Sequence, residues 1–496
     1  MVIRMKKTWS ILAACLLTAA SSMTAWARPG YTYTYDYWGD VQYSPDAYRV
    51  VSVLTHVELG LERKLDSPEG LFVRGNRIYV CDTGNSRILE IERAATDRFA
   101  VKRVIEEFSG GSGVRTFSHP TDVCETDGFF YICDKGNNRI LKLDGGLRYV
   151  AEFGKPTDAT FDQSLSFLPE KLSVDAAGRV YCIAENVNKG LIKFEADGSF
   201  NGFIGASEVT YDFADYLWKK IATKEQLAAM ESFVPTEYDN LYMDEEGFLY
   251  ACTTNVSEAN LRAGTAKPIR KLNLMGKDIL IKNGDFEPIG DIQWGDGGGY
   301  SGPSLITDVT ALNDTVYFGL DRVRGRIFAY DAQGNLLFAF GGGGNLDGYF
   351  KLPSALDHMG RDLLVLDAQD GSLTVFVPTE YGRHIYQAIE EYDQGRYLDS
   401  GETWREVLKR NGNYALAYVG IGKALARQEE YGEAMKYFRL AWDTDNYSKA
   451  FKYYRKEWVE EHIGLIFTGV FLLSAVPLGA GRIRKIRREI RRAGLK

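Results

Sequence analysis

Cysteine and histidine are scarce in this chain of 496 residues, which contains six of the first and five of the second. So few cysteines, thinly spread, do not form the framework of a disulfide-stapled domain. Cys81, Cys133 and Cys252 recur at one position of a repeated strand, which indicates small, buried, apolar side chains. A bond between Cys124 and Cys133, which share a predicted hairpin, stays open.

Familiar catalytic motifs are also missing. The sequence contains no Gly-x-Ser-x-Gly elbow, and the few histidines leave nucleophilic triads short of candidate bases. The glycine-rich run at 295–299 is not followed by the Lys-Ser/Thr of a phosphate loop, so it predicts a rim loop. Paired-carboxylate chemistry stays open, because acidic residues are too abundant to single out a pair.

Long apolar runs occur near the two ends of the chain. Residues 1–27 combine an early basic cluster, an apolar run and a small-residue site at Ala25-Trp26-Ala27, which is typical of a secretory signal peptide cut after Ala27. Leu12-Ala13-Ala14-Cys15 also resembles a lipoprotein signal, so the processing route has two interpretations.

The second apolar run lies near the C-terminus. Residues 463–481 carry no charge, and as a helix they would span about 28 Å, close to the thickness of a bilayer core. Eight basic residues follow in 482–496, as expected for a cytoplasmic flank. We therefore predict a transmembrane helix at 462–481 and a basic cytoplasmic tail at 482–496, the alternative for the helix being burial in a core.

The charge of the remaining chain is strongly negative. Without the signal segment and the tail, 48 basic residues face 66 acidic ones, a net charge of about −18. Such a surface repels phosphate backbones, so we expect no nucleic-acid partner. We expect residues 462–496 instead to contact membrane lipid, with the basic tail on anionic headgroups.

An internal repeat fills the middle of the chain. Each copy has a proline, an apolar strand, a turn, a tyrosine-centred strand and an Asp/Asn/Gly turn; the copies start at Pro68, Pro120, Pro169, Pro235, Pro303 and Pro353. Short strands with tight turns at this spacing form sheets that cannot bury both faces alone, so the copies should stack into a closed ring. The segment from Tyr48 to Glu58 is expected to complete the last sheet.

Two copies are especially clear. Asp82-Thr83-Gly84-Asn85-Ser86-Arg87 and Asp134-Lys135-Gly136-Asn137-Asn138-Arg139 occupy the same place in their units. Here the chain resembles the NHL repeat, and the resemblance covers residues 48–382. It implies a mainly β fold, a six-bladed β-propeller, in which this run has an architectural role; we assign it no chemistry.

The flanking segments differ from the repeat. Residues 28–47 are rich in tyrosine, and from Arg383 the apolar period becomes helical. The spacing of small and aromatic residues at 418–441 resembles the tetratricopeptide pattern, and a poorer copy lies upstream. Residues 383–461 are therefore predicted to form a small α-helical domain. It either contacts another membrane component or only spaces the propeller from the membrane.

Aligning the innermost strands identifies a candidate site at one mouth of the channel. Gly70, Asp122, Lys171, Asn240, Asp308 and Ala355 take equivalent positions. Related propellers, including lactonases similar to gluconolactonase, hold a divalent metal there, and Asp122, Asn240 and Asp308 offer oxygen ligands suited to calcium or a similar ion. Lys171 argues against a metal and favours either a lysine–aspartate plug or a site for a small polar ligand such as a sugar.

These features lead to two functional hypotheses. The preferred one is a membrane-anchored, extracytoplasmic binding or scaffold protein without a cofactor, with a protein partner in the cell envelope. Its architecture is similar to accessory proteins of carbohydrate uptake systems. The alternative is a metal-dependent lactonase or hydrolase.

Overall fold

The computed structural model describes residues 31–158, 160–205, 237–294 and 300–494. Residues 1–27, predicted to be a signal peptide, lie outside this part of the chain. The molecule divides into two compact units, one ending at Tyr386 and the other beginning at Gln387. Each is described by itself below.

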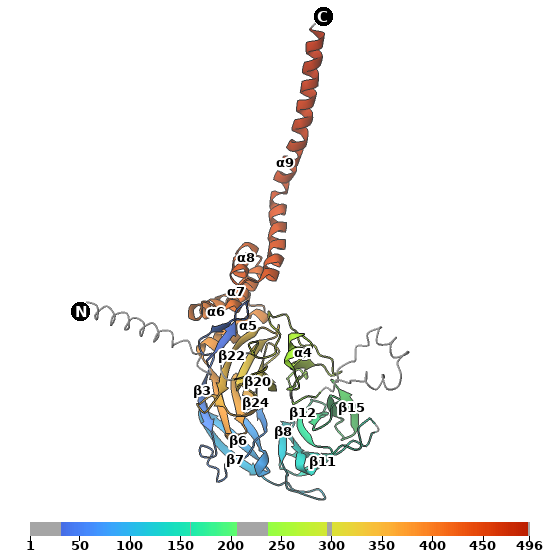
Figure 1. Ribbon diagram of the computed structural model, residues 1–496, viewed down its shortest axis with the longest axis vertical. Helices are drawn as coiled ribbons and strands as arrows, with labels where there is room; N and C mark the ends of the chain where they lie inside the picture. Colours follow the sequence, from blue (N-terminus) through green and yellow to red (C-terminus); the bar gives the residue numbers. More distant parts are fainter. Residues whose placement is uncertain (1–30, 159, 206–236, 295–299, 495–496) are drawn as a thin grey trace, which may run out of the picture. The chain divides into compact units, whose positions relative to one another are not determined.

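The first unit is built from sheets whose strands pair antiparallel, except for one parallel pair in the largest sheet (Figure 1). Four of them have four strands each: β4 (Gly70–Arg74), β5 (Arg77–Asp82), β6 (Arg87–Ala95) and β7 (Arg98–Ile105); β8 (Pro120–Thr126), β9 (Phe129–Asp134), β10 (Arg139–Asp144) and β11 (Tyr149–Phe153); β12 (Pro169–Val174), β13 (Val180–Ala184), β14 (Leu191–Phe194) and β15 (Phe200–Ile204); and β24 (Pro353–Met359), β25 (Asp362–Asp367), β26 (Ser372–Pro378) and β3 (Tyr48–Leu54).

Two further sheets differ in size. The smaller has three strands, β16 (Asn240–Met243), β17 (Leu249–Cys252) and β18 (Ile269–Leu272), with the short helix α4 (Glu258–Arg262) between the last two. The larger has seven: β19 (Ile306–Ala311), β20 (Val316–Asp321), β21 (Arg326–Asp331), β22 (Leu336–Gly343), β23 (Tyr349–Phe350), β1 (Tyr33–Tyr35) and β2 (Val41–Tyr43).

The sheets are arranged as a β-propeller. The first strand of each sheet packs against the first strand of the next, in the order β4, β8, β12, β16, β19 and β24, and β24 packs on β4. Figure 1 shows β8 beside β12. Apolar side chains on facing sheets fill the spaces between neighbours, as with Phe153, Phe167 and Phe194. Radial packing of this kind leaves only short, protected edges on the first strands.

The chain closes this ring with a strand from its N-terminal side. β3 pairs antiparallel with β26, as expected for the segment that begins at Tyr48. The strand stops at Leu54 and does not reach Glu58, because Thr55 starts a turn. The Glu58 carboxylate accepts a 3.0 Å hydrogen bond from the Thr55 amide, and the Leu59 amide donates to the Thr55 carbonyl oxygen at 3.1 Å.

The two clear repeats owe their shape to a buried aspartate. In the first, the Asp82 carboxylate accepts hydrogen bonds from the Arg87 Nε at 2.7 Å, the Asn85 amide at 2.9 Å and the Asp66 backbone N–H at 2.7 Å. Arg87 also reaches the Arg63 carbonyl oxygen at 3.1 Å. The second repeats this pattern with Asp134, Asn137, Arg139 and the Ser118 N–H. These contacts match the architectural role expected of the run.

The five described cysteines lie on or beside these strands, and all are buried with free thiols. Cys81, Cys133 and Cys252 stand opposite Gly70, Asp122 and Asn240 of the first strands. Cys124 and Cys133 pack in one hydrophobic cluster without a bond. Burial raises the pKa of the Cys124 thiol to about 12, so it stays protonated.

The second unit is helical. The boundary between the two units falls within α5 (Glu380–Asp393). It is followed by α6 (Tyr397–Arg410), α7 (Ala415–Arg427), α8 (Tyr431–Leu440) and α9 (Thr444–Ala493). Successive helices from α6 onward pack side by side. Small residues allow this close approach: an ideal Cβ on Gly422 would lie 2.6 Å from the Phe438 ring, inside van der Waals contact.

Gly422 therefore gives a test of this packing. We expect Gly422→Ala to lower the free energy of unfolding of the helical unit by about 1–2 kcal/mol, because forcing a methyl group into a packed core costs more than the gain in helix propensity. Gly401→Ala is the matched control, since its Cβ would meet only Ala424 at 3.6 Å. It should leave stability unchanged or raise it slightly. Urea unfolding followed by far-ultraviolet circular dichroism measures both, and equal effects would contradict the packing account.

The last helix is continuous over 50 residues. The end of the predicted helical domain, residues 444–461, and the apolar run after it belong to the same helix α9. Its first turns pack against α8 through Ala450, and residues 451–461 are exposed. α9 is the one helix in the described part of the chain that is long and apolar enough to cross a membrane.

Candidate functional site

The six aligned positions lie on the first strands of the six sheets. Pairing with the second strands sets their level: Gly70 stands opposite Cys81, Asp122 opposite Cys133, Lys171 opposite Ile183, Asn240 opposite Cys252, Asp308 opposite Leu320, and Ala355 opposite Leu366. In four sheets a bulge precedes this level. Because the first strands form a ring, these residues line one level of the propeller axis.

The aspartates at this level connect neighbouring sheets. The Asp122 Oδ2 accepts a 2.9 Å hydrogen bond from the Leu172 backbone N–H on β12. The Asp308 Oδ2 accepts one of 2.6 Å from the Leu356 N–H on β24. Each carboxylate therefore ties its own strand to the next strand of the ring, which is a structural use of a charged group.

The second oxygen is also occupied. The Asp308 Oδ1 accepts a 2.7 Å hydrogen bond from the Val309 N–H, directly after it in the strand. The Asn240 Oδ1 bonds the Leu241 N–H at 2.8 Å in the same way. The side chains predicted as possible metal ligands are thus acceptors of backbone N–H groups.

Lys171 carries the positive charge at this level. Its Nζ donates a 2.7 Å hydrogen bond to the carbonyl oxygen of Glu69, just before β4. Burial acts to lower the pKa of Lys171, but the carboxylates of Asp122 and Asp308 outweigh it, so the pKa is raised and the ammonium stays charged. The structure therefore brings Lys171, Asp122 and Asp308 into one electrostatic group.

Both carboxyl groups titrate above their usual range. Burial raises the pKa of Asp122 from 3.8 to about 6 and that of Asp308 to about 7, while Lys171 and the backbone N–H groups act in the opposite direction. Lys171 is one cation beside two buried acids, so it does not neutralise both. The pKa values of Asp122 and Asp308 therefore stay above their usual range.

These residues do not fit a divalent metal ion. Calcium needs six or more oxygen ligands, whereas the oxygens here accept backbone N–H groups and the Lys171 ammonium lies among them. In the described ranges, no group of three His, Cys, Asp or Glu side chains is placed to hold a metal. The hydrolase alternative based on Asp122, Asn240 and Asp308 finds no support in this geometry.

Sequence alignment missed a third connecting carboxylate. Asp357, two residues beyond the aligned Ala355, accepts a 2.7 Å hydrogen bond from the Val73 N–H on β4 and so ties β24 to β4. Hydroxyl groups strengthen the same level: Thr83 donates to the Pro120 carbonyl oxygen at 2.9 Å and Ser354 to that of Pro68 at 2.8 Å. The prolines that begin the repeats were visible in the sequence, but not that their carbonyl groups serve as acceptors.

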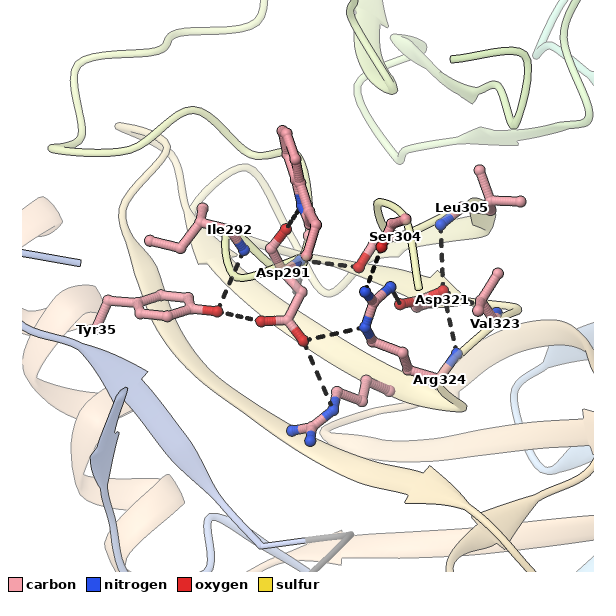
Figure 2. A network of polar contacts seen from close by, with 12 residues as sticks. Tyr35, Asp291, Ile292, Ser304, Leu305, Asp321, Val323 and Arg324 are labelled. Atoms are coloured by element: carbon pink, nitrogen blue, oxygen red, sulfur yellow. Dashed lines mark hydrogen bonds and ion pairs between the residues drawn. The ribbon is translucent and has the colours of Figure 1, made fainter. Parts of the chain in front are cut away.

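A second buried polar group lies in the seven-stranded sheet (Figure 2). Asp321 and Arg326 stand opposite each other as Asp82 and Arg87 do. Here, however, Arg326 lies over the Tyr33 ring at 4.7 Å and its Nε is 3.9 Å from Asp291.

Arg324 takes a central place in this network. It lies between the carboxylates of Asp291, at 3.4 Å, and Asp321, at 3.6 Å. The Tyr35 hydroxyl group also bonds Asp291. The buried arginine–aspartate contact of the other repeats is thus rearranged to hold the N-terminal segment.

Comparison of the sequence with family models and with curated proteins gives no match. Solved structures do show similarity. Virginiamycin B lyase from Staphylococcus aureus is 10% identical, with 66% of this chain and 99% of that one covered and a TM-score of 0.37. BamB from Moraxella catarrhalis is 14% identical, with 62% and 71% covered and a TM-score of 0.29. An extracellular domain described as part of a hybrid two component system from B. thetaiotaomicron is 10% identical, with 66% and 43% covered and a TM-score of 0.38.

With TM-scores below 0.4, these similarities support no conclusion about fold or activity. The assignment of a β-propeller therefore rests on the ring of strands in this chain. The chain is a mainly β propeller followed by helices, the last of which is apolar enough to enter a membrane.

Proposed function

We propose that this chain is a membrane-anchored binding or scaffold protein whose propeller lies outside the cytoplasm. In this proposal the six sheets are six NHL-type blades, and the helices after them are tetratricopeptide-like repeats that contact another component of the cell envelope. Residues 1–27 export the chain, the apolar part of α9 crosses the bilayer, and the basic residues after it stay in the cytoplasm.

The observation that carries the proposal is the state of the channel residues. Asp122, Asp308 and Asp357 bond the backbone of neighbouring strands, and Lys171 offsets part of the charge of Asp122 and Asp308. A catalytic group needs a lone pair or a proton free for a substrate, whereas these groups are engaged in holding the ring. The propeller then serves as a rigid frame, and binding takes place on its surface.

The part of Lys171 that is open to solvent also offers a contact for a small polar ligand, such as a sugar, at this mouth. Lys171 is partly open to solvent, and an ammonium with two further donor positions can bond hydroxyl oxygens. A sugar ligand and the helical repeats together fit an accessory role in carbohydrate uptake, which we include in the proposal.

Labelling of intact cells tests both location and binding. The five described cysteines are buried, so single cysteines at exposed sites can carry a membrane-impermeant maleimide photocrosslinker. We expect Lys102→Cys on β7 and Leu398→Cys on α6 to react in intact cells or spheroplasts, and Lys485→Cys on α9 to react only after lysis. Illumination should then link the Leu398→Cys chain to a protein of defined size.

The controls separate the two claims. Labelling of Lys485→Cys before lysis, with Lys102→Cys protected, would reverse the orientation and overturn the extracytoplasmic location. Correct labelling without a crosslinked product from Leu398→Cys would leave the anchor in place and remove the role of the repeats as a binding surface.

A further inference from the structure

The N-terminal hairpin adds two strands, β1 and β2, to the sheet formed by β19 to β23. β1 pairs with β22, and among the described residues β2 pairs with β1 alone, so β2 is the last strand of the path. The hairpin is fixed firmly. The Tyr35 hydroxyl bonds the buried Asp291 (Figure 2). At the hairpin turn Gly39 has a positive φ, and a Cβ there would lie 3.2 Å from the Ile292 side chain. β2 therefore presents a rigid free edge.

The register identifies the free backbone groups. The Ser44 N–H donates to the Thr32 carbonyl oxygen at 2.9 Å, and the Asp36 N–H to that of Asp40 at 3.0 Å. Hydrogen-bonded pairs alternate in an antiparallel ladder, so Gln42 also bonds β1, opposite Thr34. The N–H and C=O groups of Val41 and Tyr43 consequently point away from β1, on either side of Gln42.

The outer strands β7, β11, β15, β18 and β3 carry features that block edge-to-edge pairing. Charged residues lie on β7, β11, β18 and β3, such as Lys102 and Glu152, and β15 has a bulged register with Gly202 at positive φ. β2 consists of Val41, Gln42 and Tyr43 and carries no charge. Apart from its short length and the Pro45 that follows it, β2 has no such feature.

Exposed aromatic rings surround this edge. Trp38 is 70% exposed, Tyr43 59% and Tyr37 42%. The rings of Tyr37 and Trp38 meet edge to face at 5.1 Å, which holds them in place at the hairpin turn. Rigid, exposed tryptophan and tyrosine side chains are the residues that most often dominate protein interfaces.

We propose that β2 pairs with β2 of a second copy of this chain, antiparallel about a twofold axis at Gln42. Val41 of each copy then stands opposite Tyr43 of the other, and their outward groups form four hydrogen bonds. Asp40 stands opposite Ser44, so no two acids face each other.

A second copy fits this edge better than a longer strand of another protein. The free edge is short: Pro45, which has no N–H, follows it on one side, and the turn at Asp36 to Asp40 limits it on the other. The contact is small, and the proposal rests on the membrane anchoring of the proposed function, because confinement to a bilayer raises the effective concentration of a weak pair.

Cysteine crosslinking in native membranes tests this pairing. Gln42 would face Gln42 of the other copy in a non-hydrogen-bonded pair, whose Cα atoms lie about 4.5 Å apart, within the range of a disulfide. In the full chain, Gln42→Cys should give a dimer on non-reducing gels after mild copper-catalysed oxidation by oxygen, which takes two protons and two electrons from the two thiols. Lys102→Cys on β7 is the matched control and should stay monomeric.

A second substitution makes the result specific. Val41→Pro removes an outward N–H without touching the β1 ladder, so in the Gln42→Cys background it should abolish most of the dimer. A monomeric Gln42→Cys chain, a bond to a protein of another size, or a dimer unchanged by Val41→Pro would each overturn the pairing. If Lys102→Cys and Lys485→Cys still report the expected orientation, the proposed function survives that failure.

Discussion

Asp82→Ala is expected to lower the free energy of unfolding of the propeller by about 3–5 kcal/mol, because it leaves the Arg87 guanidinium buried without its carboxylate. Arg87 and Asp82 are almost fully buried and 2.7 Å apart. The substitution also removes the acceptor of the Asp66 N–H and of the Asn85 amide. Urea unfolding of the full chain, followed by tryptophan fluorescence, measures the loss.

Two comparisons decide whether burial is the cause. Asp134→Ala removes the same set of contacts from the next sheet and should cost somewhat less, because Arg139 keeps the Glu152 carboxylate at 3.3 Å. Glu106→Ala removes the pair with Arg63, whose two side chains are 52% and 54% exposed, and should cost much less than either. Equal small losses for all three would show that the buried arginine finds another partner and that the run does not hold the turn.

This motif could be predicted from the sequence because its residues bond to close neighbours in the chain. Asp82, Asn85 and Arg87 bond within five residues of each other, so one short pattern contains both partners. The third instance is different: Arg326 contacts Tyr33 and Asp291, which lie far away in the sequence. No short sequence pattern predicts a contact between such distant residues. The pairing of the N-terminal hairpin with β22 was missed for the same reason.

The channel site shows a related limit. Alignment of the repeats identified Asp122, Lys171 and Asp308 by position, but it could not show what their side chains bond. The acceptor of Lys171 and the donors to both aspartates are backbone groups of other strands. Every residue has a backbone N–H or C=O group, so the sequence does not show which of them a side chain bonds. An aspartate that binds a metal and an aspartate that links two strands therefore cannot be told apart until the fold is known.

The sequence also did not predict where the helices of the second unit begin and end. The period of apolar residues predicted helices, and the uncharged run predicted a span, but α9 continues through both. Nothing between them breaks a helix, since residues 444–462 contain neither glycine nor proline. The apolar segment is therefore joined to the packed helices without a turn between them.

Lys171→Met is expected to make the propeller's stability depend more steeply on pH. In the wild type, the pKa values of Asp122 and Asp308 rise on folding from 3.8 to about 6 and about 7, so the folded state holds protons more tightly than the unfolded one. Stability from these groups is therefore complete below the unfolded pKa and is lost as pH rises through the folded values. Without the ammonium both pKa values rise further, and the loss grows.

The size of this effect follows from the position of the lysine. We expect Lys171→Met to cost about 2 kcal/mol at pH 8, a value reduced because the side chain is partly open to solvent, and less than half of that at pH 5. Asp308→Asn is the control: it removes one titrating group, so in the Lys171→Met background it should recover stability at pH 8 and flatten the profile. Thermal unfolding from pH 5 to pH 8 measures all variants. A Lys171→Met profile parallel to the wild type would mean that the lysine acts through its bond to the Glu69 carbonyl oxygen alone, and that the two carboxylates are screened from it.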